Sequence, residues 1–166
     1  MPRVAVVYHS GYGHTKVLAE SVAKGAAADA VIFGSPTYMG SASAAMKGFM
    51  EATSKIWMEQ KWKDKIAAAF VNSGSQNGDR QTVFQQFITF ALQHAMIWVG
   101  LDLLPGNNSS KGSVDDLNRL GVSAGAAAQT NVDEGPDAVT TSDRKTAERL
   151  GARVAETVAK LALVAA

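Results

Sequence analysis

Six residues near the start of the chain, Ser10-Gly11-Tyr12-Gly13-His14-Thr15, combine small side chains with hydrogen-bond donors. They follow a β-branched run and precede apolar residues at helical spacing, so they form a strand-to-helix turn. The free N–H groups of a first helical turn, with the positive end of the helix dipole, favour an anion. The segment therefore indicates a phosphate-binding loop, although an ordinary turn with a serine N-cap has the same composition.

The spacing excludes two common nucleotide-binding loops. Lys16 follows Thr15, whereas a Walker loop places its lysine before the hydroxyl residue. Gly11 and Gly13 lack the third glycine of the dinucleotide-binding fingerprint, because Lys16 stands there instead. Neither ATP nor a Rossmann-type dinucleotide is therefore the expected ligand.

Apolar patterning predicts alternating strands and helices along the rest of the chain. Strands are expected at residues 4–8, 30–34, 66–71 and 96–101. Helices are expected from 14 to a C-cap at Gly25, and over 42–56, 82–95 and 142–163. The stretch 106–135 is poor in hydrophobic periodicity and is expected to be a long loop. This alternation predicts a parallel sheet with helices on both faces.

Three polar loops, residues 10–15, 35–41 and 72–79, each follow a predicted strand. The carboxyl ends of parallel strands meet at one edge of the sheet, where α/β proteins bind their ligands. We therefore expect the three loops to be walls of one site.

Composition restricts the class of protein. The 16 basic and 15 acidic residues are interspersed, so nucleic acid is not an expected partner. The absence of cysteine excludes disulfides and thiolate chemistry. No apolar run reaches the length of about 18 residues that indicates a membrane span, and no signal peptide is recognisable. We expect one domain over residues 1–166, in the cytoplasm.

Five blocks in order resemble the WrbA family of NAD(P)H:quinone oxidoreductases, within the flavodoxin-like superfamily. They are "YHSGYGHT", "DAVIFGSPTYMGSASAAMKGFME", Trp57 ahead of Lys65, "NSGSQNG" and "LQHAMIWVG". The resemblance implies an α/β/α sandwich with strand order 2-1-3-4-5. It also implies an FMN cofactor, two-electron ping-pong transfer from NADH or NADPH to a quinone, and a homo-oligomer, either dimer or tetramer.

The resemblance also assigns residues to the ligands. It assigns the binding of the FMN phosphate to Ser10, Tyr12, Gly13, His14 and Thr15. It assigns contacts with the ribityl chain and one edge of the isoalloxazine ring to Pro36, Thr37, Tyr38, Met39 and Gly40. It assigns the binding of the flavin pyrimidine to Asn72, Ser73, Gly74, Ser75, Gln76 and Asn77. The alternative for this segment is a plain surface turn. Tyr12 and Trp57 are assigned to the nicotinamide or quinone, and a core tryptophan is the alternative for Trp57.

The sequence departs from the family pattern at several of these positions. Tyr38 and Met39 replace an arginine and a phenylalanine, which alters the expected contact with the flavin edge. Where the family has two adjacent histidines, this chain has Gln93 and His94, and either of them is a candidate flavin contact. His94 could equally interact with a helix C-terminus.

The largest departure lies between Gly25 and Asp29, where the family has a second strand and a second helix. A direct link from the first helix to the third strand would move that helix to the other face or give a rare left-handed crossover. Two interpretations stay open: residues of the chain are missing from the sequence, or a true deletion leaves the first strand at the edge. An intact mass of 17.4 kDa would exclude the first.

Two other functions remain possible for such a chain. One is an electron carrier of the flavodoxin type, although these are usually acidic and the net charge here is +1. The other is a flavin-free scaffold or regulatory protein. For the enzyme, no side chain is expected to act as an acid or base, because the cofactor carries the chemistry.

Overall fold

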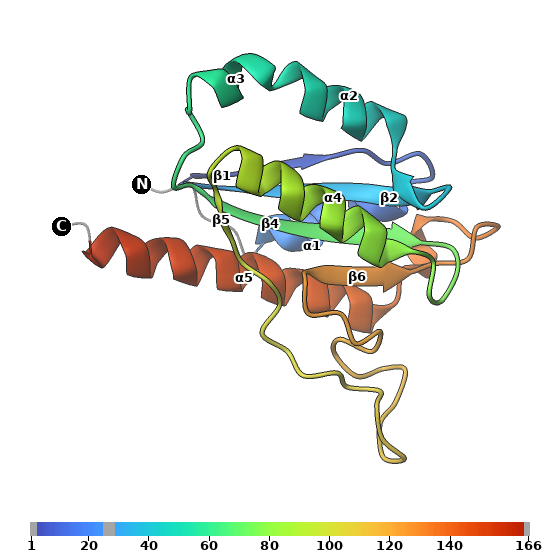
Figure 1. The fold of residues 1–166 in the computed structure, drawn as a ribbon. Helices are drawn as coiled ribbons and strands as arrows, with labels where there is room; N and C mark the ends of the chain where they lie inside the picture. The colour runs from blue at the N-terminus through green and yellow to red at the C-terminus, as the bar shows by residue number, and fades with distance from the viewer. Residues whose placement is uncertain (1–2, 25–28, 165–166) are drawn as a thin grey trace.

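The computed structural model describes residues 3–24 and 29–164 and has alternating strands and helices (Figure 1). The amino-terminal half contains β1 (Arg3–Tyr8), α1 (His14–Lys24), β2 (Asp29–Tyr38), β3 (Ser41–Ala42), α2 (Ala44–Ala52) and α3 (Ser54–Met58). The second half contains β4 (Ile66–Ser73), α4 (Arg80–Gln93), β5 (Ile97–Trp98), β6 (Ala126–Gln129), the 3-10 helix η1 (Pro136–Ala138) and α5 (Thr141–Val164).

The sheet is parallel in the order β1-β2-β4, and β5 and β6 share the far side of β4. β5 lies beside Ile66 and Ala67, while β6 lies beside the segment from Phe70 to Ser73. The two short strands therefore occupy one strand position that a long excursion interrupts. β3 forms a small antiparallel hairpin with the end of β2.

The expected strand over 96–101 is in the right place but is too long, and the expectation of an uninterrupted loop over 106–135 is wrong. It missed β6, whose Ala-Ala-Ala-Gln sequence has weak strand propensity. Gly125 precedes this strand, and a Cβ on it would lie 2.2 Å from the carbonyl oxygen of Ala69. A close backbone approach, rather than side-chain pattern, thus brings β6 against β4.

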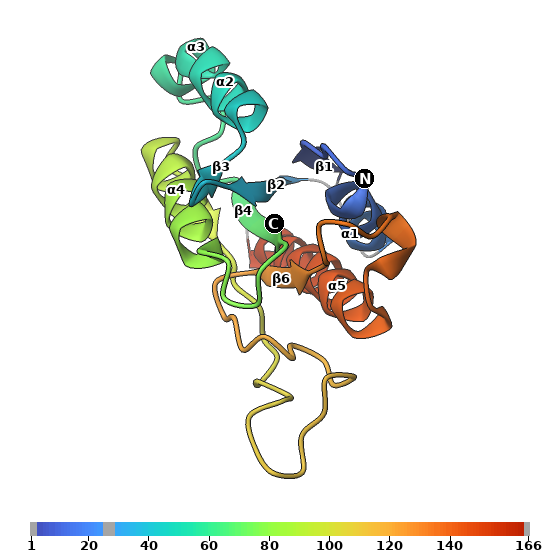
Figure 2. The same ribbon diagram turned by 90° about the vertical axis from the view of Figure 1, so that its right-hand side faces the viewer.

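Helices cover both faces of the sheet, which makes the α/β/α sandwich expected from the sequence (Figure 2). On one face, α1 and α5 pack on Ile32, Ala68 and Phe70 in one apolar cluster. On the other face, α2 and α4 pack on Phe33 and Val71 in a second cluster. Neighbouring residues of one strand thus point to opposite clusters, as the period of a strand requires.

The strand order matches 2-1-3-4-5 with its second strand absent from the described residues, so β1 is an edge strand. Residues 25–28, where the sequence predicted a missing unit, lie outside the described residues. α1 lies on the α5 face, opposite α2 and α4, although β1-to-β2 and β2-to-β4 are steps in the same direction. The connection through α1 therefore has the opposite hand to the next crossovers, one of the two arrangements that the sequence predicted for a direct link.

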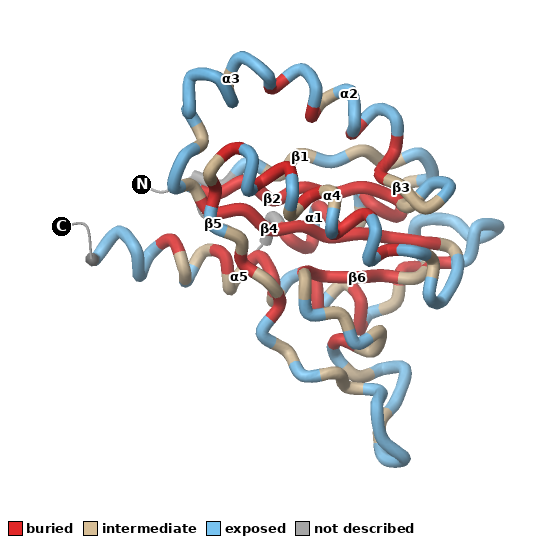
Figure 3. The backbone as a smooth tube through the Cα atoms, in the orientation of Figure 1, coloured by how far each residue is buried: buried red, intermediate tan, exposed pale blue. Residues whose placement is uncertain are grey.

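The buried residues are concentrated in the central strands of the sheet (Figure 3). β4 is buried along its whole length, whereas Ala5 and Tyr8 of the edge strand β1 are exposed. Across residues 3–24 and 29–164, no helix is both long and apolar enough to cross a bilayer.

Candidate functional site

The three polar loops meet at the carboxyl edge of the sheet, as expected, and enclose a cleft of about 110 Å³. The first loop contributes Gly11, Tyr12, His14 and Thr15 to its lining. The second contributes Pro36, Thr37 and Tyr38, and the third contributes Asn72, Ser73 and Gly74. The remaining predicted residues of these loops, Ser10, Gly13, Met39, Gly40, Ser75, Gln76 and Asn77, are not part of this lining.

A fourth wall, which sequence reasoning missed, comes from the segment after β6. Thr130 and Val132 line the cleft. Val132 fits over the third loop so closely that a Cβ on Gly74 would lie 2.4 Å from its Cγ1 atom. The sequence does have polar residues directly after β6, as it does after the other strands. They were not recognised as part of the site because β6 itself was not predicted.

The first loop is held by its own side chains and by this fourth wall. The Ser10 hydroxyl accepts a hydrogen bond from the Lys16 N–H at 3.2 Å, which caps the start of α1. The His14 ring is buried, and its Nε2 atom lies 2.9 Å from the Glu134 carbonyl oxygen. Gly13 has a φ of +87°, a conformation that favours glycine, and it packs on Pro136.

The second loop extends β2 beyond its predicted end at Gly34 and turns at Met39-Gly40, where both residues have positive φ. Met39 is fully exposed at the tip, and Tyr38 is 38% exposed beside it. Burial, and then the nearby Tyr12, raises the pKa of the Tyr38 phenol. The Thr37 hydroxyl is buried at the cleft and has no hydrogen-bond partner among the described residues. This hydroxyl is free to bind a ligand.

The third loop turns its carbonyl groups away from the solvent. Arg80, at the start of α4, donates from its guanidinium to the carbonyl oxygens of Ser75, Gln76 and Asn77. The Gln129 side-chain amide donates to the Gly74 carbonyl oxygen at 2.9 Å. In a trans peptide the N–H points opposite to the C=O. The N–H groups of residues 75–78 therefore face outward, and none of them donates a hydrogen bond within the described residues.

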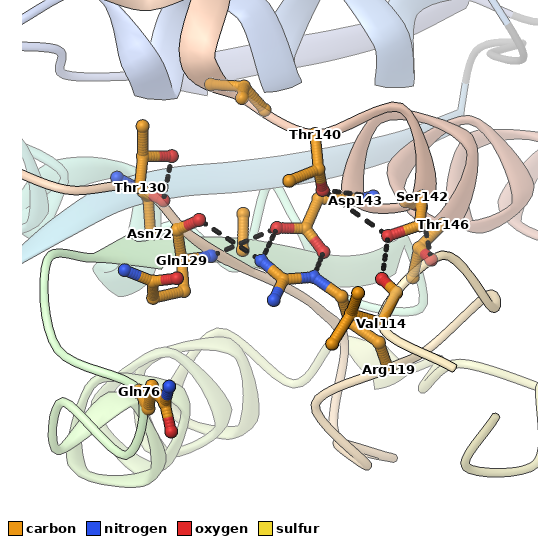
Figure 4. Close-up of polar contacts among 12 residues, drawn as sticks. Asn72, Gln76, Val114, Arg119, Gln129, Thr130, Thr140, Ser142, Asp143 and Thr146 are labelled. Carbon is orange, nitrogen blue, oxygen red and sulfur yellow. Dashed lines mark hydrogen bonds and ion pairs between the residues drawn. The ribbon is translucent and has the colours of Figure 1, made fainter. Parts of the chain in front are cut away.

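Behind this loop lies a buried charge network (Figure 4). The Arg119 guanidinium binds both carboxylate oxygens of Asp143, at 2.8 and 2.7 Å. Asp143 also accepts the backbone N–H of Gln129, whose carbonyl oxygen accepts from Arg119. Thr130 donates to the side-chain oxygen of Asn72 at 3.3 Å. The network thus attaches β6, α5 and the excursion before β6 to the third loop.

Trp57, Gln93 and His94 lie elsewhere, in a groove of about 770 Å³ between α2–α3 and α4. The carboxyl end of α4 is about 21 Å along its axis from Arg80 at the rim. Within one chain the structure therefore does not bring these three residues together with the cleft. Trp57 is 48% exposed, so the alternative of a core tryptophan is wrong. Trp62 and Trp98, both partly buried, are the tryptophans that pack against the core.

His94 is the C-cap of α4 and is buried. Its Nε2 atom lies 3.0 Å from the Thr53 hydroxyl, and its ring packs against Trp62 at a centroid distance of 4.7 Å. Burial lowers the pKa of the imidazole, so the ring is neutral at neutral pH. A neutral ring does not stabilise the helix C-terminus as a cation would.

The residues that line the cleft, together with residues 75–78 of the third loop, which continue from the lining residue Gly74, fit FMN. A phosphate suits the start of α1, the buried Thr37 hydroxyl suits a ribityl hydroxyl, and the outward N–H groups of residues 75–78 suit carbonyl oxygens and a developing negative charge on the flavin. Exposed Tyr12 and Tyr38 flank the mouth with aromatic surface. A parallel sheet that carries these loops on its carboxyl edge defines a flavodoxin-like, flavin-binding protein.

Comparisons with known proteins give the family. The NADPH-dependent FMN reductase family model matches residues 4–105. A flavodoxin, FldP, from Pseudomonas aeruginosa is 40% identical, and the match covers 93% of this chain and 96% of that protein. A NAD(P)H dehydrogenase (quinone) from Gluconacetobacter diazotrophicus is 28% identical, with 97% and 99% covered. The crystal structure of a flavodoxin, WrbA-like protein from Agrobacterium tumefaciens superposes with a TM-score of 0.75 at 34% identity, covering 96% and 99%.

The chain belongs to the NADPH-dependent FMN reductase family, in its WrbA-type, flavodoxin-like branch. The family gives FMN as the cofactor and NAD(P)H as the electron donor, and its chemistry is that of oxidoreductases. The alignments with the Pseudomonas and Gluconacetobacter proteins extend over 177 and 202 positions, although this chain has 166 residues. Both relatives therefore contain residues that this sequence lacks.

Proposed function

We propose that this protein transfers two electrons from NAD(P)H to a quinone in a ping-pong cycle. The observation that carries the proposal is the meeting of the three predicted loops around one cleft with unpartnered donors on its rim. The name of the Gluconacetobacter relative, a NAD(P)H dehydrogenase (quinone), supports a quinone as the acceptor.

The roles of the residues follow from their chemistry. Bound FMN supplies the redox chemistry, hydride uptake from a nicotinamide and delivery of two electrons to the acceptor. The loop 10–15 would hold its phosphate, and the Thr37 hydroxyl would bind the ribityl chain. The N–H groups of residues 75–78 would hold the pyrimidine and favour negative charge there. The aromatic faces of Tyr12 and Tyr38 would orient a flat nicotinamide or quinone by stacking.

We further propose that the working form is a homo-oligomer. Trp57, Gln93 and His94 are site residues by resemblance but lie in the groove between α2–α3 and α4. A second copy whose cleft faces this groove would bring the two sets together. Light scattering on the FMN-loaded protein should give a dimer or a tetramer, and a monomer would contradict this proposal.

The main test is spectroscopic. The protein is loaded with FMN, freed of excess, and treated under nitrogen with NADH or NADPH and then with benzoquinone. We expect the visible flavin absorption to bleach with the nicotinamide and to recover with the quinone. Steady-state rates at several quinone concentrations should give parallel double-reciprocal lines, because the two substrates use the site in turn.

An electron carrier is the second candidate, and it is favoured by the 40% identity to a protein named as a flavodoxin. A carrier binds FMN but is not reduced by a free nicotinamide, so binding without bleaching would support it. Absence of FMN binding would contradict both candidates and would support the alternative of a flavin-free scaffold or regulatory protein.

A further inference from the structure

The third loop depends on a residue whose position is unusual. Arg80 is the first residue of α4, and the residue is only 4% exposed. A cation at a helix N-terminus opposes the helix dipole, and burial of a guanidinium removes its hydration. Other interactions must compensate for both costs.

Those interactions are hydrogen bonds to backbone carbonyl oxygens. The Nε atom donates to Ala128 of β6 at 2.9 Å, and Nη2 donates to Ser75 at 2.8 Å. The Nη1 atom donates to Gln76 and Asn77, both at 2.5 Å. The planar fork of donors thus attaches the loop to β6, a geometry that a lysine cannot reproduce.

The charge of Arg80 is not neutralised by an ion pair. The acid that acts on it electrostatically is Asp143, which forms its bidentate pair with Arg119. Among the ion pairs of residues 3–24 and 29–164, none includes Arg80. Arg80, Arg119 and Asp143 together therefore place a net positive charge behind the loop. Burial lowers the pKa of Arg80 to about 10, so it remains charged at neutral pH.

We propose that Arg80 is the positioning residue for the flavin: it holds the carbonyl oxygens of residues 75–77 from behind, turns the following N–H groups toward the rim, and favours negative charge on the bound ring. This inference rests on the flavin placement proposed above. It assigns a role to a residue outside the loops that the sequence singled out. It also explains how a loop of exposed polar residues without secondary structure keeps its donors aligned.

The test separates the geometry of the fork from its charge. Arg80→Lys keeps the charge and loses the fork, whereas Arg80→Gln loses the charge and most of the fork. Gln129→Met keeps Arg80 and removes the amide that donates to Gly74 and to the Asn131 side chain. Lys160→Gln, on the exposed carboxyl-terminal part of α5, changes the net charge equally and is the control.

Two readouts are made on each folded variant. Backbone NMR order parameters of residues 75–78 without FMN should be near 0.85 in the wild type and below about 0.6 in both Arg80 variants. The dissociation constant of oxidised FMN should rise about tenfold in both Arg80 variants and less in Gln129→Met. In Arg80→Gln the constant for reduced FMN should rise about tenfold more, which lowers the two-electron potential by about 30 mV. Arg80→Lys and Lys160→Gln should keep the wild-type potential.

Wild-type order parameters and FMN affinity in Arg80→Gln would overturn the proposal. An unchanged potential in that variant would overturn the role of its charge. Should Arg80→Gln fail to fold, Arg80→Met replaces it, because an apolar chain leaves no unpaired amide in the buried site. If neither neutral variant folds, Arg80→Lys decides, and wild-type values in it overturn the proposal. Failure of the wild type to bind FMN would instead contradict the proposed function, while the order parameters would still report on the loop.

Discussion

Asp143 is the residue on which the charge network behind the cleft depends. Its carboxylate is 2% exposed and pairs with Arg119, whose side chain is 11% exposed. Asp143→Asn would leave Arg119 buried without its counter-charge, with the cation Arg80 nearby. We expect the variant to lose about 3–5 kcal/mol of unfolding free energy, measured by urea denaturation.

The matched control for this prediction is an exposed pair. Glu51 and Lys47 form an i,i+4 ion pair on α2, with side chains 68% and 63% exposed. Glu51→Gln should cost less than about 0.5 kcal/mol, because water screens such pairs. Equal losses in the two variants would mean that the buried network does not stabilise the fold.

At the scale of elements, the contact between β2 and β4 depends on a glycine. A Cβ on Gly34 would lie 2.1 Å from the Cζ atom of the Phe70 ring, which is fully buried. Gly34→Ala should therefore destabilise the protein by about 1–3 kcal/mol through overpacking. Thermal unfolding of the apoprotein measures this, and an unchanged melting temperature would show that the strands can separate without cost.

Gly48 of α2 provides the opposite case for the same substitution. It is exposed, and a Cβ there would have no neighbour within 4 Å. Gly48→Ala should stabilise the protein by about 0.5–1 kcal/mol, because alanine has the higher helix propensity.

The attachment of α5 to the segment after β5 should depend on acid. Asp102 accepts hydrogen bonds from Arg149 at 3.0 Å and pairs with Arg153 at 3.1 Å, which lowers the pKa of its carboxyl to about 2. The folded state therefore binds this proton more weakly than the unfolded chain, whose value is 3.8. The carboxylate stabilises the fold above about pH 4, and this contribution is lost as the pH falls toward 2.

The variant Asp102→Asn should be less stable than the wild type at pH 7 and should lose less stability between pH 4 and pH 2. Urea denaturation at several pH values measures both effects. Asp133→Asn, at an exposed aspartate without an ion pair among the described residues, is the control. Parallel pH profiles for Asp102→Asn and the wild type would contradict the prediction.

For the whole molecule, the sequence predicted what local pattern controls. The loops at 10–15, 35–41 and 72–79 were located because each follows a run of β-branched or apolar residues, although β2 extends to Tyr38 and β4 to Ser73. β6, Thr130 and Val132 were missed because three alanines have no periodicity and their strand depends on contact with β4. Arg80 was missed for a related reason, since its partner Ala128 lies 48 residues away.

The uncovered edge at β1 has a consequence for the stability of the whole sheet. β1 pairs with β2 alone, whereas β4 pairs with strands on both sides and is buried throughout. Amide hydrogen exchange should therefore be at least tenfold faster in β1 than in β4, because the edge strand can open without breaking the core. The comparison is made by NMR or mass spectrometry on protein whose intact mass is 17.4 kDa.

Slow exchange in β1 would contradict this prediction and would mean that another strand covers the edge. Dilution would then identify the strand, since pairing between two copies is lost at low protein concentration and pairing within one chain is not. A mass above 17.4 kDa would support a natural chain with a segment beyond this sequence, since its relatives carry additional residues. In that case the segment should occupy the edge beside β1, because a strand there gives the connection through α1 the usual right hand.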